Sequence, residues 1–320
     1  MKYKITHTTK YAYTEAVSVC HNQVHLAPRD MPSQQCEMFR LLIHPTPADR
    51  GRRIDYFGNH VDYFSIHEAH RGLTVTANSR VTVKPPPTVD VAASRPWEDV
   101  VRELRADLSP AGLDAFQYVF DPSTNAMGPN LHPSGRTNGY ANGQFDSAAL
   151  DRQILDYVRP SFPAGRPVLE AARDLTRRIH TDFVYDPKAT TVFTSVAEAL
   201  RLRRGVCQDF ALVEIACLRA MGLAARYVSG YLRTEPPPGR PRLIGADASH
   251  AWASLYAGAL GWVDFDPTND VLPGEDHITI AWGRDYNDVC PIQGVFVGGG
   301  QHAMSVAVDI VPATAETLSA

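Results

Sequence analysis

The first 84 residues alternate between short runs of β-forming residues and turns rich in glycine, proline, aspartate and arginine. Branched and aromatic side chains in short runs are typical of strands in all-β domains. The runs cover 3–13, 39–44, 60–66 and 73–83. The prolines at 85–87 end this pattern, because proline has no backbone N–H to donate to a sheet. We therefore predict a β-rich, sandwich-like N-terminal domain over residues 1–85.

Helical periodicity replaces the strand pattern after these prolines. Residues 97–107 and 148–158 have helical patterns, and the stretch 121–146 between them is dense in proline, glycine, asparagine and serine. We interpret 86–160 as a helical linker region that contains a long loop. A further helix is predicted over 168–180, because apolar residues recur there in steps of three and four.

The helix expected from Cys207 to about Met221 is apolar around most of its circumference. A helix with this pattern is buried at the centre of a domain. Strand-like segments follow it at 225–231, 250–256, 261–265, 277–282 and 304–311. This order predicts a second domain over 161–320 of the α+β class, with the buried helix packed on an antiparallel sheet.

Size, charge and cysteine content narrow the classes of function. The chain has 320 residues, is 44% hydrophobic and carries a formal net charge of -4, with no broad cationic field for nucleic acid or membranes. No run reaches the roughly 18 apolar residues of a spanning helix. Met1–Lys10 carry charge and hydroxyl groups where a secretory signal has an apolar core, so we expect a cytoplasmic protein. The sequence does not predict its oligomeric state.

Cys207 is the candidate for a reactive thiol. The five cysteines are scattered and odd in number, which argues against a disulfide framework and leaves at least one free thiol. Cys207 follows a glycine and a valine, at the predicted first turn of the apolar helix. The unpaired N–H groups and positive dipole end of a helix favour a thiolate. The competing interpretation is a structural cysteine, which is a common small core residue.

A predicted hairpin supplies a base and a carboxylate. Residues 249–256 and 261–268 have the pattern of two strands, and a three-residue tip at 257–259 would place His250 opposite Asp266. Directly opposed side chains have Cβ atoms about 4.5 to 5.5 Å apart. A carboxylate at that distance can orient an imidazole to take a thiol proton. A purely structural histidine and acid pair is the alternative.

Four motifs of the second half form a specific combination. They are Gly-Val-Cys-Gln-Asp-Phe-Ala at 205–211, Ala-Arg-Tyr-Val-Ser-Gly-Tyr-Leu at 225–232, Ser-His-Ala-Trp at 249–252 and Gly-Trp-Val-Asp-Phe-Asp-Pro-Thr-Asn at 261–269. Together they resemble the bacterial transglutaminase-like family, and the β-rich first domain is similar to the N-terminal module of that family. The resemblance covers nearly the whole chain.

The resemblance implies a papain-like fold and a catalytic triad of Cys207, His250 and Asp266. One departure is Leu212, where the family often has a histidine five residues after the catalytic cysteine. The cysteine would attack an amide carbonyl and form a thioester, which water or an amine would then release. We expect an amide or isopeptide hydrolase that acts on a protein or peptide without a cofactor or metal. A protein-glutamine transamidase and a non-catalytic scaffold are the alternatives.

Further residues are candidates for binding the substrate. The backbone N–H of Cys207 is the natural first donor to an oxyanion. Tyr185 is the candidate for a second donor. Gln208 and Trp252 are candidates for contact with substrate, although the first helical turn explains Gln208 structurally and packing explains Trp252.

Overall fold

The computed structural model describes residues 1–120, 147–234 and 248–313, so the loop predicted at 121–146 lies outside the described residues. The chain divides into two compact units. Unit 1 comprises Met1–Thr88, Val228–Ala251 and Pro273–Ala320, and unit 2 comprises Val89–Tyr227 and Trp252–Leu272. The division falls within two strands, β8 (Ala225–Leu232) and β9 (Ala248–Tyr256). The sequence predicts three consecutive domains, over 1–85, 86–160 and 161–320. That division into separately folding domains stays a prediction.

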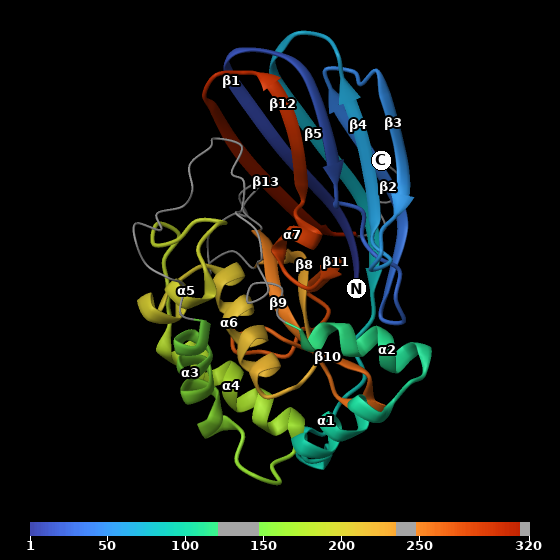
Figure 1. The fold of residues 1–320 in the computed structure, drawn as a ribbon. Helices are drawn as coiled ribbons and strands as arrows, with labels where there is room; N and C mark the ends of the chain where they lie inside the picture. The colour runs from blue at the N-terminus through green and yellow to red at the C-terminus, as the bar shows by residue number, and fades with distance from the viewer. Residues whose placement is uncertain (121–146, 235–247, 314–320) are drawn as a thin grey trace, which may run out of the picture. The chain divides into compact units, whose positions relative to one another are not determined.

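Unit 1 is built on one very long strand, β1 (Lys2–Val24). The first half of β1 pairs antiparallel with β5 (His70–Val83) and with β13 (His302–Pro312). Its second half pairs antiparallel with β4 (His60–Ile66) and β12 (Ile292–Gly298). In Figure 1, β12 and β13, in red, run alongside β1, in dark blue. A single strand therefore joins the two halves of the sheet.

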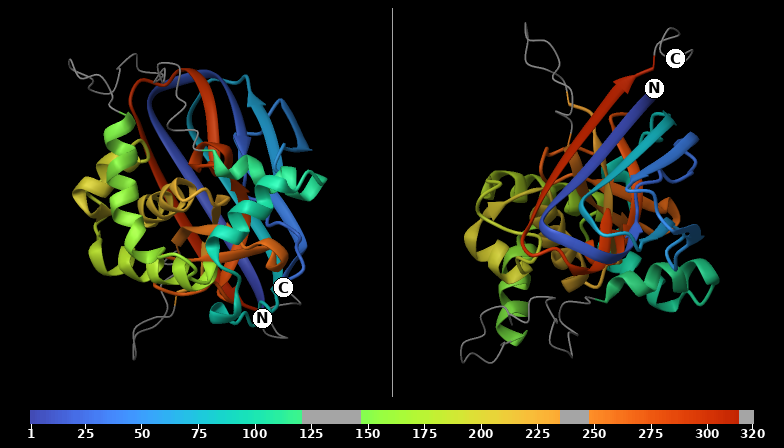
Figure 2. Two further views of the ribbon diagram at one scale, coloured as in Figure 1. Left: turned by 60° about the horizontal axis from the view of Figure 1, so that its bottom comes forward. Right: turned by 90° about the horizontal axis from the view of Figure 1, so that it is seen from above.

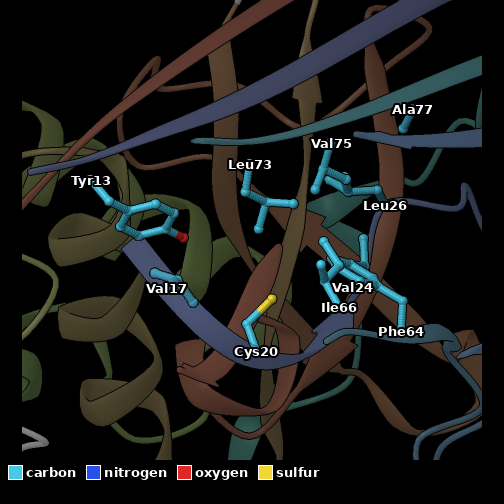
Figure 3. Packing of buried hydrophobic residues seen from close by; sticks show 10 residues of the cluster. All are labelled: Tyr13, Val17, Cys20, Val24, Leu26, Phe64, Ile66, Leu73, Val75 and Ala77. Carbon is cyan, nitrogen blue, oxygen red and sulfur yellow. The ribbon is translucent and has the colours of Figure 1, made fainter. Parts of the chain in front are cut away.

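Two further strands complete this seven-stranded sheet: β2 (Gln34–His44) pairs with β5, and β3 (Asp49–Ile54) pairs with β4. Alternate side chains of the strands point inward and form a buried apolar cluster. Figure 3 shows its members: Tyr13, Val17, Cys20, Val24, Leu26, Phe64, Ile66, Leu73, Val75 and Ala77. The prediction of a β-rich N-terminal region is confirmed.

Side-chain amides join the first 88 residues to β11 (His277–Gly283) within unit 1. Gln34 accepts a hydrogen bond from the backbone N–H of Thr279 and donates one to its carbonyl, both at 2.8 Å. Asn59 makes the same pair of bonds with the backbone of Trp282, at 3.0 and 2.9 Å. Each amide thus pairs with a strand backbone as another strand would. The short helix α7 (Tyr286–Val289) follows β11.

Unit 2 is organised around α6 (Cys207–Ala220), whose residues are mostly buried, as predicted. Three helices pack against it, and Figure 2 shows them grouped together. They are α3 (Ser147–Val158), α4 (Val168–Asp182) and α5 (Val196–Leu202). Earlier in the chain lie α1 (Trp97–Ala106) and α2 (Pro110–Phe116). In the described part of the chain, no helix combines the length and apolar character that a membrane span needs.

A four-stranded sheet has the order β10-β9-β8-β11. β10 (Trp262–Phe265) pairs antiparallel with β9. The strands predicted from the sequence at 225–231, 250–256, 261–265 and 277–282 correspond to these four strands. The strand predicted at 304–311 was expected in the same sheet, but it lies within β13 and pairs with β1. Helices followed by a largely separate set of strands give the predicted α+β class.

The buried Arg219 ties the C-terminal end of α6 to two backbone segments of unit 2. Its Nε donates to the carbonyls of Tyr118 and Ala225, at 2.9 and 3.1 Å, and its Nη2 donates to the carbonyl of Ala225 at 2.8 Å. A cation at the end of a helix is favoured by the helix dipole. Arg219 is 8% exposed, so these bonds replace its contact with water.

We expect Arg219→Met to lower the free energy of unfolding by about 2 to 4 kcal/mol, because buried carbonyls lose a charged donor. Denaturant unfolding measures the change. The matched control is Arg102→Met, because Arg102 is 72% exposed and its ion pair with Asp99 lies at the surface. Equal losses of stability in the two variants would contradict this role of Arg219.

Candidate active site

The backbone at the start of α6 is held by Asp209. Its Oδ2 accepts hydrogen bonds from the backbone N–H of Val206, at 2.8 Å, and from the hydroxyl of Thr190, at 2.7 Å. This is one half of a capping box, in which an acid in the first turn bonds back to the residue before the helix. Burial raises the pKa of the Asp209 carboxyl. Cys207 is thereby fixed as the first residue of the helix.

Gly205 leaves the space that this carboxylate occupies. A Cβ atom on Gly205 would lie 2.3 Å from Oδ2 of Asp209, which no side chain tolerates. Gly205 also pairs with Tyr185, in a two-stranded parallel sheet of β6 (Val184–Tyr185) and β7 (Arg204–Gly205). The requirement for glycine therefore comes from the cap of the helix that begins at Cys207.

The parallel pair places Tyr185 near the candidate nucleophile. Partial burial raises the pKa of Tyr185, and the charge of Cys207 raises it further. The ring of Tyr185 also packs edge-on against Phe210 of α6, with centroids 6.5 Å apart. This position suits the expected second oxyanion donor, and that role stays a prediction.

All five cysteines are free thiols, and Cys207 is partly exposed. Burial raises the pKa of the other four, which are Cys20, Cys36, Cys217 and Cys290. For Cys36 the raised value is about 11. A thiolate is the reactive form of cysteine, so these four thiols are poor nucleophiles at neutral pH.

Gln208 and Trp252 both have packing roles in unit 2. Gln208 is buried, and its Nε2 donates to the carbonyl of Val192 at 3.3 Å. Trp252 is fully buried, and its indole N–H donates to Oδ2 of Asp264 at 3.0 Å. Contact of either side chain with substrate stays a prediction.

The register of the hairpin differs from the predicted one. Ser254 pairs with Asp264, so the loop covers 257–261 and has five residues, not three. The cause is Gly261, which the pattern predicts as a strand residue but which has φ 71, a left-handed conformation that only glycine adopts easily. The prediction that His250 pairs directly with Asp266 in the ladder is therefore wrong. A shift of two residues leaves each side chain on the expected face.

Asp266 is fully buried just after β10, and its carboxylate has a fixed orientation in unit 2. Its Oδ1 accepts from the backbone N–H groups of Thr268 and Asn269, at 3.0 and 3.3 Å. Its Oδ2 accepts from the side-chain amide of Asn269 at 2.7 Å. Asn269 is the last residue of the fourth motif and was not predicted as a site residue; the signal for this bond is an amide three residues after an acid.

The turn that contains Asn269 is anchored to α4. Arg173 donates to the side-chain Oδ1 of Asp270, and its Nη2 donates to the carbonyl of Asp270 at 2.8 Å. Asp270 has φ 53, which is uncommon for a residue with a side chain. Bidentate contact with an arginine holds this conformation in place.

His250 belongs to unit 1 and is buried, with 7% of its surface exposed. Its ring lies beside the ring of His277, with centroids 6.0 Å apart. Imidazole nitrogens exchange protons near neutral pH and can also bind a divalent metal, so either chemistry is open to this pair. Because Cys207 and Asp266 belong to unit 2, the predicted triad stays a prediction.

Two family models match the chain, one in its N-terminal part and one in its second half. The model of the bacterial transglutaminase-like N-terminal region matches residues 3–82, and that of the transglutaminase-like superfamily matches residues 157–267. An uncharacterized protein of Mycobacterium tuberculosis is 41% identical over 330 residues, which cover 100% of this chain and 95% of that protein. A protein-glutamine gamma-glutamyltransferase of Pseudomonas aeruginosa is 32% identical over 125 residues, which cover 38% of this chain and 18% of that protein.

A solved structure has the same fold over nearly the full length. It comes from Cytophaga hutchinsonii, is described as a "putative cysteine protease", and has a TM-score of 0.69 at 19% sequence identity. The likeness covers 98% of this chain and 92% of that one. The two matched regions and the full-length relative show that the chain belongs to the bacterial transglutaminase-like family, with its β-rich N-terminal region and its transglutaminase-like core.

Proposed function

We propose that this chain is a cysteine-dependent hydrolase that cleaves amide or isopeptide bonds of a protein or peptide. Cys207 is the nucleophile, His250 the base and Asp266 the residue that orients the histidine. The observation that carries the proposal is the position of Cys207, which is partly exposed at the capped N-terminus of a buried helix. The raised pKa values of the other four thiols make them poor nucleophiles at neutral pH, and the helix dipole favours a thiolate at Cys207.

The first half of the reaction forms a thioester. His250 takes the proton of the Cys207 thiol, and the sulfur attacks the carbonyl carbon of the amide. The resulting oxyanion accepts a hydrogen bond from the backbone N–H of Cys207, with Tyr185 as the proposed second donor. When the C–N bond breaks, His250 gives its proton to the leaving amine.

Water completes the reaction. His250 takes a proton from water as the water oxygen attacks the thioester carbonyl. The C–S bond then breaks, the product leaves as a carboxylic acid, and the sulfur regains a proton from His250. Asp266 is suited to its role because three hydrogen bonds fix its carboxylate, so it can favour one tautomer and one orientation of the imidazole.

A second candidate function is transfer to an amine in place of water. This function is favoured by the match with the protein-glutamine gamma-glutamyltransferase of Pseudomonas aeruginosa, which covers 38% of this chain. The chemistry up to the thioester is the same for both functions. Only the second nucleophile differs, so the same triad supports either product.

The first prediction concerns the pairing of thiol and base. We expect iodoacetamide to alkylate Cys207 faster than the other four cysteines near neutral pH, and His250→Ala to slow this reaction at least tenfold, because the base is lost. Peptide mass mapping across pH measures each rate. His67→Ala is the control, since His67 is an exposed histidine of the same unit. Equal rates in the wild type and His250→Ala would exclude the pairing.

The second prediction concerns the orientation of Asp266. We expect Asn269→Ala to slow alkylation and turnover by about ten- to a hundredfold, because a hydrogen bond to a carboxylate contributes about 1.5 to 3 kcal/mol. Asn269→Asp should cause a larger loss, because it places a like charge 2.7 Å from Oδ2. If both variants keep the wild-type rate and lose only thermal stability, Asn269 supports the turn and not the reaction.

The third prediction separates hydrolase from transferase. Glutaminyl and isopeptide compounds are incubated with and without an excess of a primary amine, and the products are identified by mass spectrometry. We expect the free acid to remain the main product when the amine is present, since water releases the thioester. An amine conjugate as the main product would assign the transferase function. Cys207→Ala is the control and should give neither product.

A further inference from the structure

A carboxyl group lies on the nucleophile helix outside the predicted triad. Glu214 is seven residues after Cys207 in α6, which is about two helical turns, so both residues lie on the same side of the helix. Its side chain is 0% exposed. An acid in the middle of a mostly apolar helix requires a physical explanation, because a buried charge without partners is costly.

The contacts of Glu214 provide an acceptor for a protonated carboxyl. Its Oε1 lies 2.7 Å from the hydroxyl of Thr176 in α4, and this hydroxyl also lies 2.9 Å from the carbonyl of Ala172. A hydroxyl has one proton, and a carbonyl can only accept. When Thr176 donates to Ala172, its contact with Glu214 needs a proton on the carboxyl. The other oxygen, Oε2, is buried with no hydrogen-bond partner among the described residues.

The carboxylates around Glu214 act in the same direction as its burial. Burial raises the pKa of Glu214 to about 8, and the negative charges of Asp266 and Asp270 contribute to this. Thr176 and Arg173 on α4 act in the opposite direction and are outweighed. On its own helix, burial and Glu214 raise the pKa of Cys217, which therefore stays a neutral thiol.

We propose that Glu214 is a positioning residue that carries a proton while the site is active. Its protonated carboxyl joins α6, the helix of Cys207, to α4, and it keeps a second negative charge away from Asp266. Loss of this proton in alkaline solution adds a second negative charge that acts against that of Asp266, and it breaks the tie between the helices. The proposal rests on the proposed function, because it assigns Cys207 and Asp266 their roles in the reaction.

The proton makes a measurable contribution to stability. The ordinary pKa of a glutamate is 4.5, and in the folded protein that of Glu214 is about 8. Between these values the folded state holds a proton that the unfolded chain has lost. The contribution of Glu214 to stability is therefore fully present below pH 4.5 and is lost as the pH rises towards 8.

Glu214→Gln tests the proton directly, since the amide is neutral at every pH and can donate to Thr176. We expect the Tm of Glu214→Gln, relative to that of the wild type, to rise by roughly 5 °C from pH 5 to pH 8. Above pH 8 this difference should level off. The burial of the amide adds an offset that does not depend on pH. The control is Glu198→Gln on α5, where the carboxyl is exposed and the difference should be constant.

The pH profile of Cys207 alkylation and of turnover tests the positioning role. We expect the wild-type rates to fall above about pH 8, and this alkaline limb to move up by at least one pH unit in Glu214→Gln. A Tm difference that does not change with pH overturns the proposal. Identical alkaline limbs in the two proteins also overturn it, because Glu214 is then a structural tie alone.

Failure of the proposed function and failure of the positioning role of Glu214 give different results. If Cys207 is unreactive in both proteins at every pH, the proposed function fails and the positioning role fails with it. The pH dependence of the Tm difference still shows in that case whether Glu214 holds a proton. Thr176→Val is a second variant: removal of the hydroxyl should lower Tm in the wild-type background and leave the slope with pH in place.

Discussion

The hydrogen bond from the backbone N–H of Val206 to the carboxylate of Asp209 fixes the geometry on which the candidate site depends. A helix leaves its first N–H groups without partners, and this bond satisfies the one just before the first turn. It determines that the helix begins at Cys207. It also explains why position 205 has no side chain and why the loop of Thr190 packs against the helix start. A thiol placed by such a cap has a defined direction as well as a favourable dipole.

Strong periodic patterns were enough to predict much of the fold. The helix α6 and the strand β4 have the predicted limits to within one residue, because their apolar positions are continuous or alternate clearly. β3 was missed because most of its residues are charged and exposed, and its pairing with β4 uses the backbone. The hairpin register was wrong because a positive φ at Gly261 lengthened the loop.

The candidate site was predictable only where one residue type implies one chemistry. A cysteine at a helix start, a histidine in a strand and an acid after the next strand can be recognised along the chain. The supports of these residues cannot, because their partners are distant in sequence. Thr176 and Glu214 are 38 residues apart, and Arg173 and Asp270 are 97 apart. Such pairs arise from the packing of α4, which no local pattern shows.

The pairing of β1 with β12 and β13 has a consequence for synthesis of the protein. β12 and β13 lie far behind β1 in the sequence, so β1 leaves the ribosome long before the two strands that pair with it. Until they follow, β1 presents unpaired N–H and carbonyl groups, and closing so long a loop costs entropy. The nascent chain thus carries an open sheet edge during this interval, which exposes it to pairing with other chains.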